Sequence, residues 1–352
     1  MKAKKSEFFD NLRKKASATP KRIVFPEGDD LRVIEAVKIM TESKMIYPVL
    51  LGKCSVIESL CKQSALPLSE LQIIDPEIES SKPLYHEELL ALFKKKGLDI
   101  EEAKTLTKDR LNFGSLLVRL NQADGFVGGS VRTTADTVRA VFRIIGLSKK
   151  TPTLSSCFLM ELENSQYGHN GRFVYADCAV VIKPSAAQLA NIALASAQTF
   201  SDLIEAEPKV GFLSFSTKGS AKDESIDIIQ QALEIVKKKN PQLAADGEFQ
   251  LDAAIDADVA KKKIKDASAV AGKSNVLIFP DLNSGNIGYK ITQRLAKARA
   301  VGPILQGLSK AANDLSRGCS AEDIIDVTAV TVIQAESLQK LSKIEEKVSD
   351  KN

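Results

Sequence analysis

The sequence is poor in the residues that build most metal centres and disulfide frameworks. It contains only two histidines, His86 and His169, and neither has a partner at metal-ligand spacing. Histidine-based catalytic triads and zinc chemistry are therefore not expected. The five cysteines are an odd number, spread widely and without a Cys-x-x-Cys pair, which is typical of free thiols in a reducing compartment.

Long apolar runs and an excess of one charge are also missing. No apolar run reaches the roughly 18 residues that span a bilayer, and the opening Met-Lys-Ala-Lys-Lys-Ser-Glu-Phe-Phe lacks the apolar core of a secretory signal. We therefore expect a cytoplasmic protein with no membrane partner. The net charge is only +4 and both signs are interspersed, whereas nucleic-acid binders concentrate basic residues on one face, so no nucleic-acid partner is expected.

The chain has enough apolar residues to form the cores of about two domains. It has 352 residues, of which 44% are hydrophobic and 27% charged. Short runs rich in β-branched residues predict strands at 22–26, 47–51, 71–74, 125–128, 153–158, 172–182, 210–215, 249–255, 275–280 and 300–306. Longer amphipathic segments predict helices at 30–43, 87–96, 100–121, 134–145, 186–204, 225–239, 257–271, 285–298 and 321–347. This alternation predicts an α/β fold whose mostly parallel sheets are covered on both faces.

Polar, glycine-containing loops follow several of the predicted strands. They are residues 25–29, 128–130, 214–220 and 280–286. Ligands of open α/β sheets bind beyond the carboxyl ends of the strands. The loops therefore predict a cleft between two domains, lined with backbone N–H groups, hydroxyls and amides. Taken singly, each loop is also explained by ordinary turn chemistry.

Residues 128–136, Gly-Gly-Ser-Val-Arg-Thr-Thr-Ala-Asp, allow two interpretations. Thr133-x-x-Asp136 is the pattern of a helix capping box. A helix start beside two glycines, with arginines nearby, also suits a bound phosphate. The loop 214–220 offers a similar anion site, but it lacks the GxxxxGK[ST] spacing, so nucleoside-triphosphate hydrolysis is not expected.

The segment 313–323, Asn-Asp-Leu-Ser-Arg-Gly-Cys-Ser-Ala-Glu-Asp, concentrates reactive side chains. Ser316 and Arg317 lie at the tip of a glycine-broken turn, where a fixed positive charge could hold an anion. Asp323 follows closely enough to reach the same pocket as a base. Ser320-x-x-Asp323 is equally a capping box, so the segment alone does not decide between the two roles.

Together these segments resemble the phosphate acetyltransferase (phosphotransacetylase) family over nearly the whole chain. The resemblance is carried by Phe25-Pro-Glu-Gly28 with Arg32, Asn112-Phe-Gly114, Ala123-Asp-Gly125, Thr134-Ala-Asp-Thr-Val-Arg139, Tyr175-Ala-Asp177, 214–220, Asp246-Gly-Glu248 with Asp252-Ala-Ala254, 275–286 and 313–320. Matches in this number and order are specific, and they favour a catalytic role for 313–323.

The resemblance implies reversible transfer of an acetyl group between acetyl phosphate and coenzyme A, which gives acetyl-CoA and phosphate. It implies two three-layer α/β/α domains akin to isocitrate and isopropylmalate dehydrogenases, an active-site cleft between them, and a homodimer. It also implies that the C-terminal segment returns to the first domain. We therefore expect domain I at 1–149 plus 306–352 and domain II at 150–305. Coenzyme A is implied as a substrate, with no permanently bound cofactor or metal.

The resemblance also implies roles for particular residues. The residues that match catalytic ones are Asp323 as the base for the coenzyme A thiol, Ser316 to orient the sulfur, and Arg317 on the phosphoryl group. Arginines of the family that bind substrate and coenzyme are matched by Arg32, Arg139 and Arg294. From the polar loops we expect further contacts from Ser130, Thr133, Ser216, Thr217, Lys218, Asn283, Asn286 and Lys290.

Two chemical points stay open. Family members often carry Arg before a Lys-His-Lys-Gly run, whereas this chain has Phe93 before Lys94-Lys-Lys-Gly97. One phosphate or coenzyme contact then lacks its guanidinium, unless Lys94 or Lys95 replaces it as a point charge. In addition, Cys319 would offer a covalent acyl route if the neighbouring Arg317 and a helix start lowered its pKa.

Three other functions remain for comparison. The first is transfer of butyryl or another short acyl group on the same fold, which depends on the volume of a pocket. The second is a dehydrogenase on the related fold, although no Asp cluster with a Tyr/Lys pair stands out. The third is a non-catalytic sensor of coenzyme A or acetyl phosphate, which the intact Ser316, Arg317 and Asp323 argue against.

Overall fold

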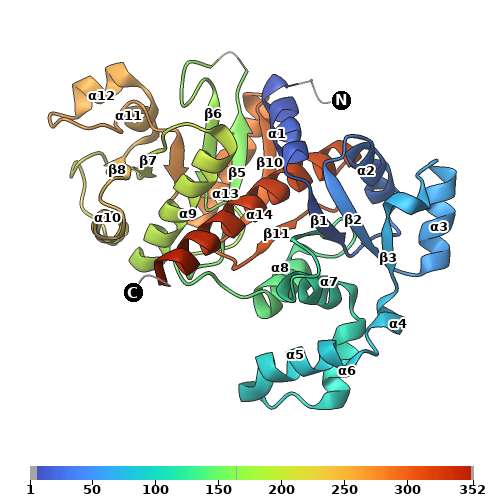
Figure 1. Ribbon diagram of the computed structural model, residues 1–352. Coiled ribbons are helices and arrows are strands. Elements are labelled where there is room, and N and C mark those ends of the chain that lie inside the picture. Colours follow the sequence, from blue (N-terminus) through green and yellow to red (C-terminus); the bar gives the residue numbers. More distant parts are fainter. Residues whose placement is uncertain (1–5, 164, 350–352) are drawn as a thin grey trace. The chain divides into compact units, whose positions relative to one another are not determined.

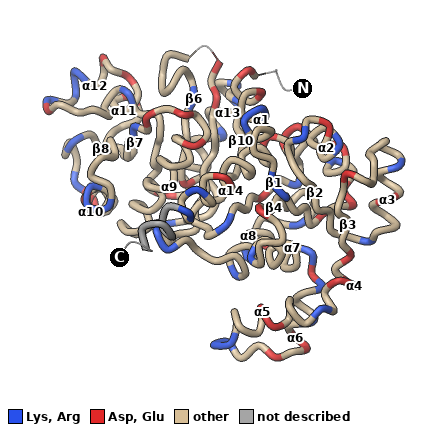
Figure 2. The backbone as a smooth tube through the Cα atoms, viewed as in Figure 1, with Lys and Arg blue, Asp and Glu red and all other residues tan. Residues whose placement is uncertain are grey.

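The computed structural model describes residues 6–163 and 165–349. The chain divides into two compact units: one takes in the chain up to Gly146 and again from Leu308, and the other is Leu147–Gly307. Each unit has its own sheet (Figure 1). Basic and acidic residues are interspersed along both units (Figure 2). Within the described ranges, no helix has the length and apolar character needed to cross a membrane.

The first unit is built on a five-stranded parallel sheet in the order β11-β4-β1-β2-β3. Its strands are β1 (Lys21–Phe25), β2 (Ile46–Leu51), β3 (Gln72–Ile74), β4 (Gly125–Gly128) and β11 (Ala311–Asp314). Because the pairing is parallel, the carboxyl ends of β1, β4 and β11 lie at one edge, where Asp314 pairs with Gly128. The loops that follow these three strands are therefore neighbours, although they are far apart in the sequence.

Helices cover this sheet because its central strands are apolar and buried. Those in contact with the sheet are α2 (Leu31–Glu42), α3 (Cys54–Gln63), α7 (Arg110–Arg119), α8 (Thr134–Ile144) and α14 (Ala321–Ser349). The unit also contains α1 (Glu7–Ala18), α4 (Pro76–Glu79), α5 (Pro83–Phe93) and α6 (Ile100–Lys108), with short 3-10 helices η1 (Leu68–Glu70) and η2 (Lys94–Lys96), and α4–α6 project away from the sheet (Figure 1). The long α14, red in Figure 1, packs on α1, α2 and the strands β4 and β11. It buries Ile324, Val327 and Val330 against them, so the N-terminal end of α14 is firmly placed.

The second unit has a six-stranded mixed sheet in the order β10-β5-β6-β9-β7-β8. Its elements are β5 (Ser155–Glu161), β6 (Arg172–Ala176), α9 (Ala186–Ile204), β7 (Lys209–Leu213), α10 (Glu224–Lys239), β8 (Ala244–Phe249), α11 (Leu251–Ile255), α12 (Ala257–Lys263), β9 (Val276–Ile278), α13 (Leu282–Leu295) and β10 (Arg299–Gln306). The pairs β6–β9, β9–β7 and β7–β8 are parallel, whereas β5 pairs antiparallel with β10 and β6. Phe158, Phe173 and Phe249 lie in its core.

The α/β fold class with mostly parallel sheets is confirmed, but several predicted elements are wrong in detail, among them the helix expected at 257–271, which ends at Lys263. The helix expected at 100–121 is two helices, because Asp109 has extended backbone and caps α7 through the N–H groups of Leu111 and Asn112. The strand expected at 249–255 is instead the end of β8 followed by α11. The strand expected at 172–182 stops at Ala176, because the Asp177 carboxylate accepts hydrogen bonds from the backbone N–H groups of residues 179–181.

Candidate functional site

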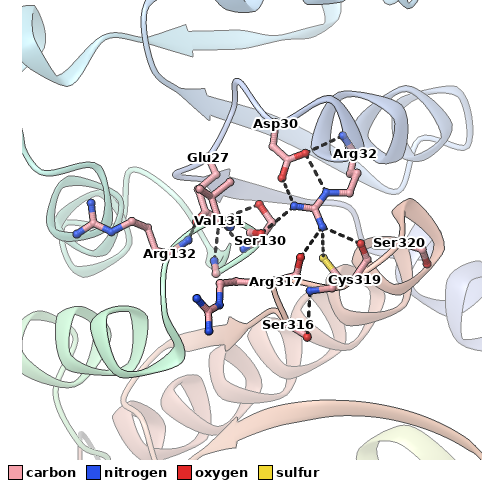
Figure 3. Close-up of polar contacts among 12 residues, drawn as sticks. Glu27, Asp30, Arg32, Ser130, Val131, Arg132, Ser316, Arg317, Cys319 and Ser320 are labelled. Carbon is pink, nitrogen blue, oxygen red and sulfur yellow. Dashed lines mark hydrogen bonds and ion pairs between the residues drawn. The ribbon is translucent and has the colours of Figure 1, made fainter.

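Four of the residues predicted for the site are brought together by the loops after β1, β4 and β11. These loops are residues 26–30, 129–133 and 315–320, and α2 begins directly after the first of them. They carry Ser130, Ser316 and Arg317, while Arg32 lies in the first turn of α2. The whole group belongs to the first unit, and hydrogen bonds connect the loops to one another (Figure 3).

The backbone N–H groups of the second loop bind a carboxylate of the chain itself. Glu27 is only 6% exposed. Its Oε2 accepts hydrogen bonds from the N–H groups of Gly129 and Ser130, both at 2.7 Å, and from the Ser130 hydroxyl at 3.0 Å. Its Oε1 accepts from the N–H groups of Val131 at 2.9 Å and Arg132 at 2.6 Å. A carboxylate of the chain therefore occupies the N–H groups of residues 129–132, while phosphate binding at the helix start beside them stays a prediction.

The position of Gly129 shows why this loop needs glycine. Its φ is +104°, and a Cβ atom there would lie 2.3 Å from Oδ1 of Asp314 and 2.9 Å from the carbonyl oxygen of Leu315. Any side chain would therefore be strained and would collide with the loop that follows β11. Close approach of the two loops depends on the missing side chain.

Arg32 joins all three loops through its guanidinium group. Its Nε and Nη2 donate to the two carboxylate oxygens of Asp30, at 3.1 and 2.6 Å. Nη2 also donates to the carbonyl oxygen of Ser130 at 2.8 Å, and Nη1 donates to those of Arg317 at 2.8 Å and Cys319 at 3.0 Å. A guanidinium has five N–H donors, and these five bonds use all of them. The Arg32 guanidinium thus has all its donors paired within the chain, and its predicted role in ligand binding stays a prediction.

Asp30 is held in its charged form by this arrangement. Burial alone would raise the pKa of Asp30, but the hydrogen bonds from the side chain and backbone of Arg32 outweigh it and lower the pKa below its ordinary value. Asp30 also caps α2, because its carboxylate accepts from the backbone N–H of Arg32 at 2.9 Å. The ion pair therefore fixes both the start of α2 and the orientation of the guanidinium.

Ser316 and Arg317 form an exposed turn above these bonds. Cys319 N–H donates to the Ser316 carbonyl oxygen at 2.9 Å, which closes the turn, and Gly318 N–H donates to the Ser316 hydroxyl at 3.3 Å. The Arg317 guanidinium has no hydrogen-bond or ion-pair partner among residues 6–163 and 165–349, and it points away from Arg32 in Figure 3. Its backbone is thus held while its charge stays available.

Asp323 lies in the first turn of α14, and the predicted capping box is present. Its Oδ2 accepts from the N–H and the hydroxyl of Ser320, both at 2.8 Å, while its own N–H donates to the Ser320 hydroxyl at 3.2 Å. The side chain is exposed, and only Oδ2 of its two carboxylate oxygens takes part in the box. Capping and proton transfer therefore do not compete for the same oxygen.

Cys319 does not have the activated thiol that the covalent route requires. It is buried, and burial raises its pKa to about 11, although the positive charge of Arg32 acts in the opposite direction. The negative charges of Asp323 and Asp30 add to the increase. The expectation that neighbouring positive charge lowers this pKa is wrong, because the burial of the thiol outweighs the positive charge of Arg32.

The structure also reveals a buried acid that sequence reasoning missed. Asp314 ends β11 with no exposed surface, and its carboxyl oxygens have no hydrogen-bond partner of normal geometry among the described residues. Burial raises its pKa to about 7, the charge on Glu27 adds to this, and the nearby hydroxyls of Thr134 and Thr137 offset it only in part. The sequence analysis missed Asp314 because it did not predict β11, whose Ala-Ala-Asn-Asp sequence has little strand propensity.

Of the other predicted residues, Thr133 ends the second loop as the N-cap of α8, and Arg139 lies within that helix. Thr133 caps α8 and bonds to Asp136, and Arg139 pairs with the same carboxylate at 3.0 Å. A pocket of about 150 Å³ beside α8 is lined by both polar and apolar side chains, among them Phe93, Arg132, Arg139, Arg143 and Leu89. The departure from the family pattern at Phe93 therefore faces a pocket that contains three guanidinium groups.

In the second unit, Ser216, Thr217 and Lys218 lie in the loop after β7. The buried Glu248 carboxylate accepts from the Ser216 hydroxyl at 2.9 Å and from the Gly219 N–H at 2.7 Å, and Lys218 pairs with Asp246. Burial acts to raise the pKa of Glu248, but these hydrogen bonds lower it below its ordinary value. In this loop too, polar donors bind a carboxylate of the chain itself.

Four further predicted residues lie along α13 in the second unit. Asn283, Asn286, Lys290 and Arg294 follow one another at spacings that place them on one side of the helix. Lys290 donates to the Asn286 side chain at 2.8 Å, and Asn286 donates to the Cys178 carbonyl oxygen at 2.9 Å. Arg294 is exposed at the last turn. In the described part of the chain, no group of three or more His, Cys, Asp or Glu side chains is arranged to hold a metal ion.

Parallel strands whose carboxyl ends carry these loops define the class of α/β enzymes that bind ligands at that edge of the sheet. The profile of the family described as Phosphate acetyl/butaryl transferase matches residues 7–332. A phosphate acetyltransferase of Acetivibrio thermocellus is 47% identical over 330 residues, which cover 94% of this chain and 98% of that protein. The chain therefore belongs to the phosphate acetyl/butaryl transferase family, as the resemblance predicted.

Solved structures agree with this assignment. A phosphotransacetylase from Streptococcus pyogenes matches with a TM-score of 0.89 and 42% identity, covering 94% of this chain and 98% of that one. A structure described as a putative 4-hydroxythreonine-4-phosphate dehydrogenase from Salmonella typhimurium matches with a TM-score of 0.53 and 10% identity, covering 90% and 99%. The second likeness concerns the fold alone, and it supports the predicted relation to dehydrogenase folds.

Proposed function

We propose that this protein catalyses reversible transfer of an acetyl group between acetyl phosphate and coenzyme A. The observation that carries the proposal is the Ser316–Arg317 turn, whose backbone Arg32 holds while the Arg317 guanidinium stays unpaired within the described ranges. An unpaired guanidinium on a held backbone suits the phosphoryl oxygens of an acyl phosphate, which it can bind with two hydrogen bonds. Relatives named phosphate acetyltransferase at 47% and 46% identity support the acetyl group as the one transferred.

The proposed chemistry is direct attack by the coenzyme A sulfur. A thiol with a pKa of about 8.5 is mostly protonated at neutral pH, and the thiolate is the nucleophile. Asp323 takes the thiol proton, the sulfur forms a bond to the acetyl carbonyl carbon, and the bond from that carbon to the phosphate oxygen breaks. Arg317 stabilises the charge that develops on the phosphoryl and carbonyl oxygens, and Ser316 orients the sulfur. Orthophosphate leaves with the electron pair of the broken bond.

The state of Cys319 supports direct transfer over a covalent acyl-enzyme. Its pKa of about 11 keeps the thiol protonated near neutral pH, so it is a weak nucleophile. Acetyl phosphate is already an activated acyl donor, and a second thiol adds no driving force. We therefore propose a ternary complex of the enzyme with both substrates.

We further propose that the guanidinium groups that remain exposed bind the phosphates of coenzyme A. Arg139 lines the pocket that also contains Phe93 and Arg143, and this mixture of charge and apolar surface suits a phosphorylated, partly apolar ligand. Arg294 on α13 offers another exposed cation. A homodimer working in the cytoplasm, as the resemblance implies, completes the proposal.

The test is an assay of phosphate-dependent release of free thiol from acyl-CoA. Acetyl-CoA with phosphate or arsenate should release coenzyme A, and omission of the anion should stop the release. The same assay with propionyl-CoA and butyryl-CoA measures acyl preference. A clear preference for butyryl-CoA would reassign the substrate, and no release with any acyl-CoA would refute the proposed function.

A further inference from the structure

Two ionised side chains connect the three loops of the candidate site into one continuous network. Glu27 accepts the N–H groups of residues 129–132. The carbonyl oxygen of Ser130, within that same loop, accepts from Arg32 at 2.8 Å. Arg32 then donates to the carbonyl oxygens of Arg317 and Cys319. The path from Glu27 to the exposed turn therefore passes only through short hydrogen bonds (Figure 3).

The bonds in this network are of the strong kind. Each bond to Glu27 or from Arg32 involves a charged group, and charge-assisted hydrogen bonds are roughly twice as strong as neutral ones. Glu27 is buried with five donors around its two oxygens, so its position is overdetermined. A group held in this way can fix a loop that contains glycine and is otherwise free to move.

Glu27 also settles what the second loop can bind. With a carboxylate on its four N–H groups, the backbone of 129–132 cannot hold a phosphate at the same place. An anion at this place would have to be bound by side chains. The Arg317 guanidinium is the candidate, because Arg32 donates a hydrogen bond to the Arg317 carbonyl oxygen. The carboxylate thus acts on the position of Arg317 and does not itself contact the substrate.

We propose that Glu27 is a positioning residue for acyl transfer, which acts on Arg317 through Ser130 and Arg32. The proposal rests on the proposed function for its kinetic consequences, but the structural link can be measured without activity. Cys319 provides that measurement, since it is buried in the turn and its carbonyl oxygen is held by Arg32. Cys61, fully buried in the same unit, reports on opening of the whole unit.

The first experiment compares thiol labelling in the wild type and in Glu27→Gln. The substituted amide keeps the size of the side chain but turns an NH₂ group toward backbone N–H donors, so part of the loop loses its acceptor. Alkylation with iodoacetamide at one fixed pH, followed by peptide mapping, should show Cys319 labelled about tenfold faster in the variant relative to Cys61. Equal acceleration of both cysteines, or no change at Cys319, would overturn the proposal.

The second experiment measures kcat and KM in the acetyl-CoA assay. Misplacement of a catalytic group by about 1 Å can cost about 100-fold in rate, so Glu27→Gln should lower kcat by about 10- to 100-fold. KM for coenzyme A should change less than about threefold, because Glu27 contacts no substrate. A fall confined to KM, with kcat intact, would contradict a positioning role.

Two further variants separate positioning from general stability. Glu336→Gln is the matched control, because it removes the carboxylate that pairs with Lys21 on the far part of α14. It should lower the resistance to unfolding while kcat per folded enzyme stays unchanged. Arg32→Lys should lower kcat by itself, and Glu27→Gln added to it should cost less than about threefold more, because both act through one path.

The outcomes distinguish this inference from the proposed function. If the wild type releases no thiol from any acyl-CoA while Cys319 still opens selectively in Glu27→Gln, the link stands and the proposed reaction fails. If the wild type is active and the effects of Glu27→Gln and Arg32→Lys on kcat multiply independently, the link fails and the reaction stands.

Discussion

The buried acid Asp314 leads to a prediction about stability and pH. Its ordinary pKa is 3.8, and burial raises it to about 7 in the folded protein. Between these values the folded protein keeps the proton while the unfolded chain loses it. The unfolded state therefore gains free energy by ionising, and the free energy of unfolding falls as pH rises from about 4 to about 7. Above that range the loss is constant.

The size of the effect follows from the two pKa values. About 3 pH units separate them, and each is worth about 1.4 kcal/mol, so the full loss is about 4 kcal/mol. Between about pH 5 and pH 8 the remaining part is about 3 kcal/mol. Asp314→Asn cannot ionise, so it should gain about this much stability relative to the wild type over that interval. Any fixed cost of the amide cancels in the comparison.

Denaturant unfolding followed by far-ultraviolet circular dichroism is suited to this test, because the chain has no tryptophan. Wild type and Asp314→Asn are compared near pH 5 and near pH 8. As a direct check, infrared spectra of the folded wild type near pH 6 should contain the C=O band of a protonated carboxyl that the variant lacks. If the stability difference between the two proteins is the same at both pH values, the reasoning about Asp314 is refuted.

Three predictions concern the exposed turn and the start of α14. Arg317→Ala should lower kcat/KM by about 100-fold or more, as measured in the acetyl-CoA assay, and a loss below about fivefold would contradict its role at the transition state. Asp323→Asn should lower kcat with little loss of stability, whereas Ser320→Ala, which removes the hydroxyl from the capping box, should cost about 1 kcal/mol in unfolding and leave most activity. Cys319→Ala should keep most activity in steady-state assays, and inactivation combined with ping-pong kinetics in the wild type would favour the covalent route instead.

The strands of the fold were predictable wherever the sequence is locally apolar and β-branched. The predicted 22–26 and 125–128 correspond to β1 and β4 within one residue. β11 was missed because Ala311–Asp314 becomes a strand through its pairing with β4, which local propensity does not encode. The break at Asp109 was missed for a related reason, since the apolar pattern continues through α6 and α7 and only the cap interrupts it.

For the site, the sequence indicated which side chains could bind an anion or transfer a proton, but it did not indicate which residues they contact. Ser316 and Arg317 could be singled out as a polar turn before a helix, and the structure leaves both exposed. Glu27 could not be singled out in this way, because a glutamate between proline and glycine is typical of an ordinary turn. Its partners, at residues 129–132, come from a loop about 100 positions further along the chain. Long-range pairing of this kind is set by strand order, which a single sequence does not give.

The buried carboxylates explain why so many loops look like anion sites in the sequence. Glu27 accepts the backbone N–H groups of residues 129–132, Asp177 accepts those of residues 179–181, and Glu248 accepts the Gly219 N–H together with the Ser216 hydroxyl. Such groups of N–H donors favour negative charge whatever its source. Here the chain supplies the charge itself, so these N–H donors already have an acceptor within the protein. We propose that recognition of phosphate is left to exposed guanidinium groups such as that of Arg317, which has no partner among the described residues while the Arg317 carbonyl oxygen accepts a hydrogen bond from Arg32.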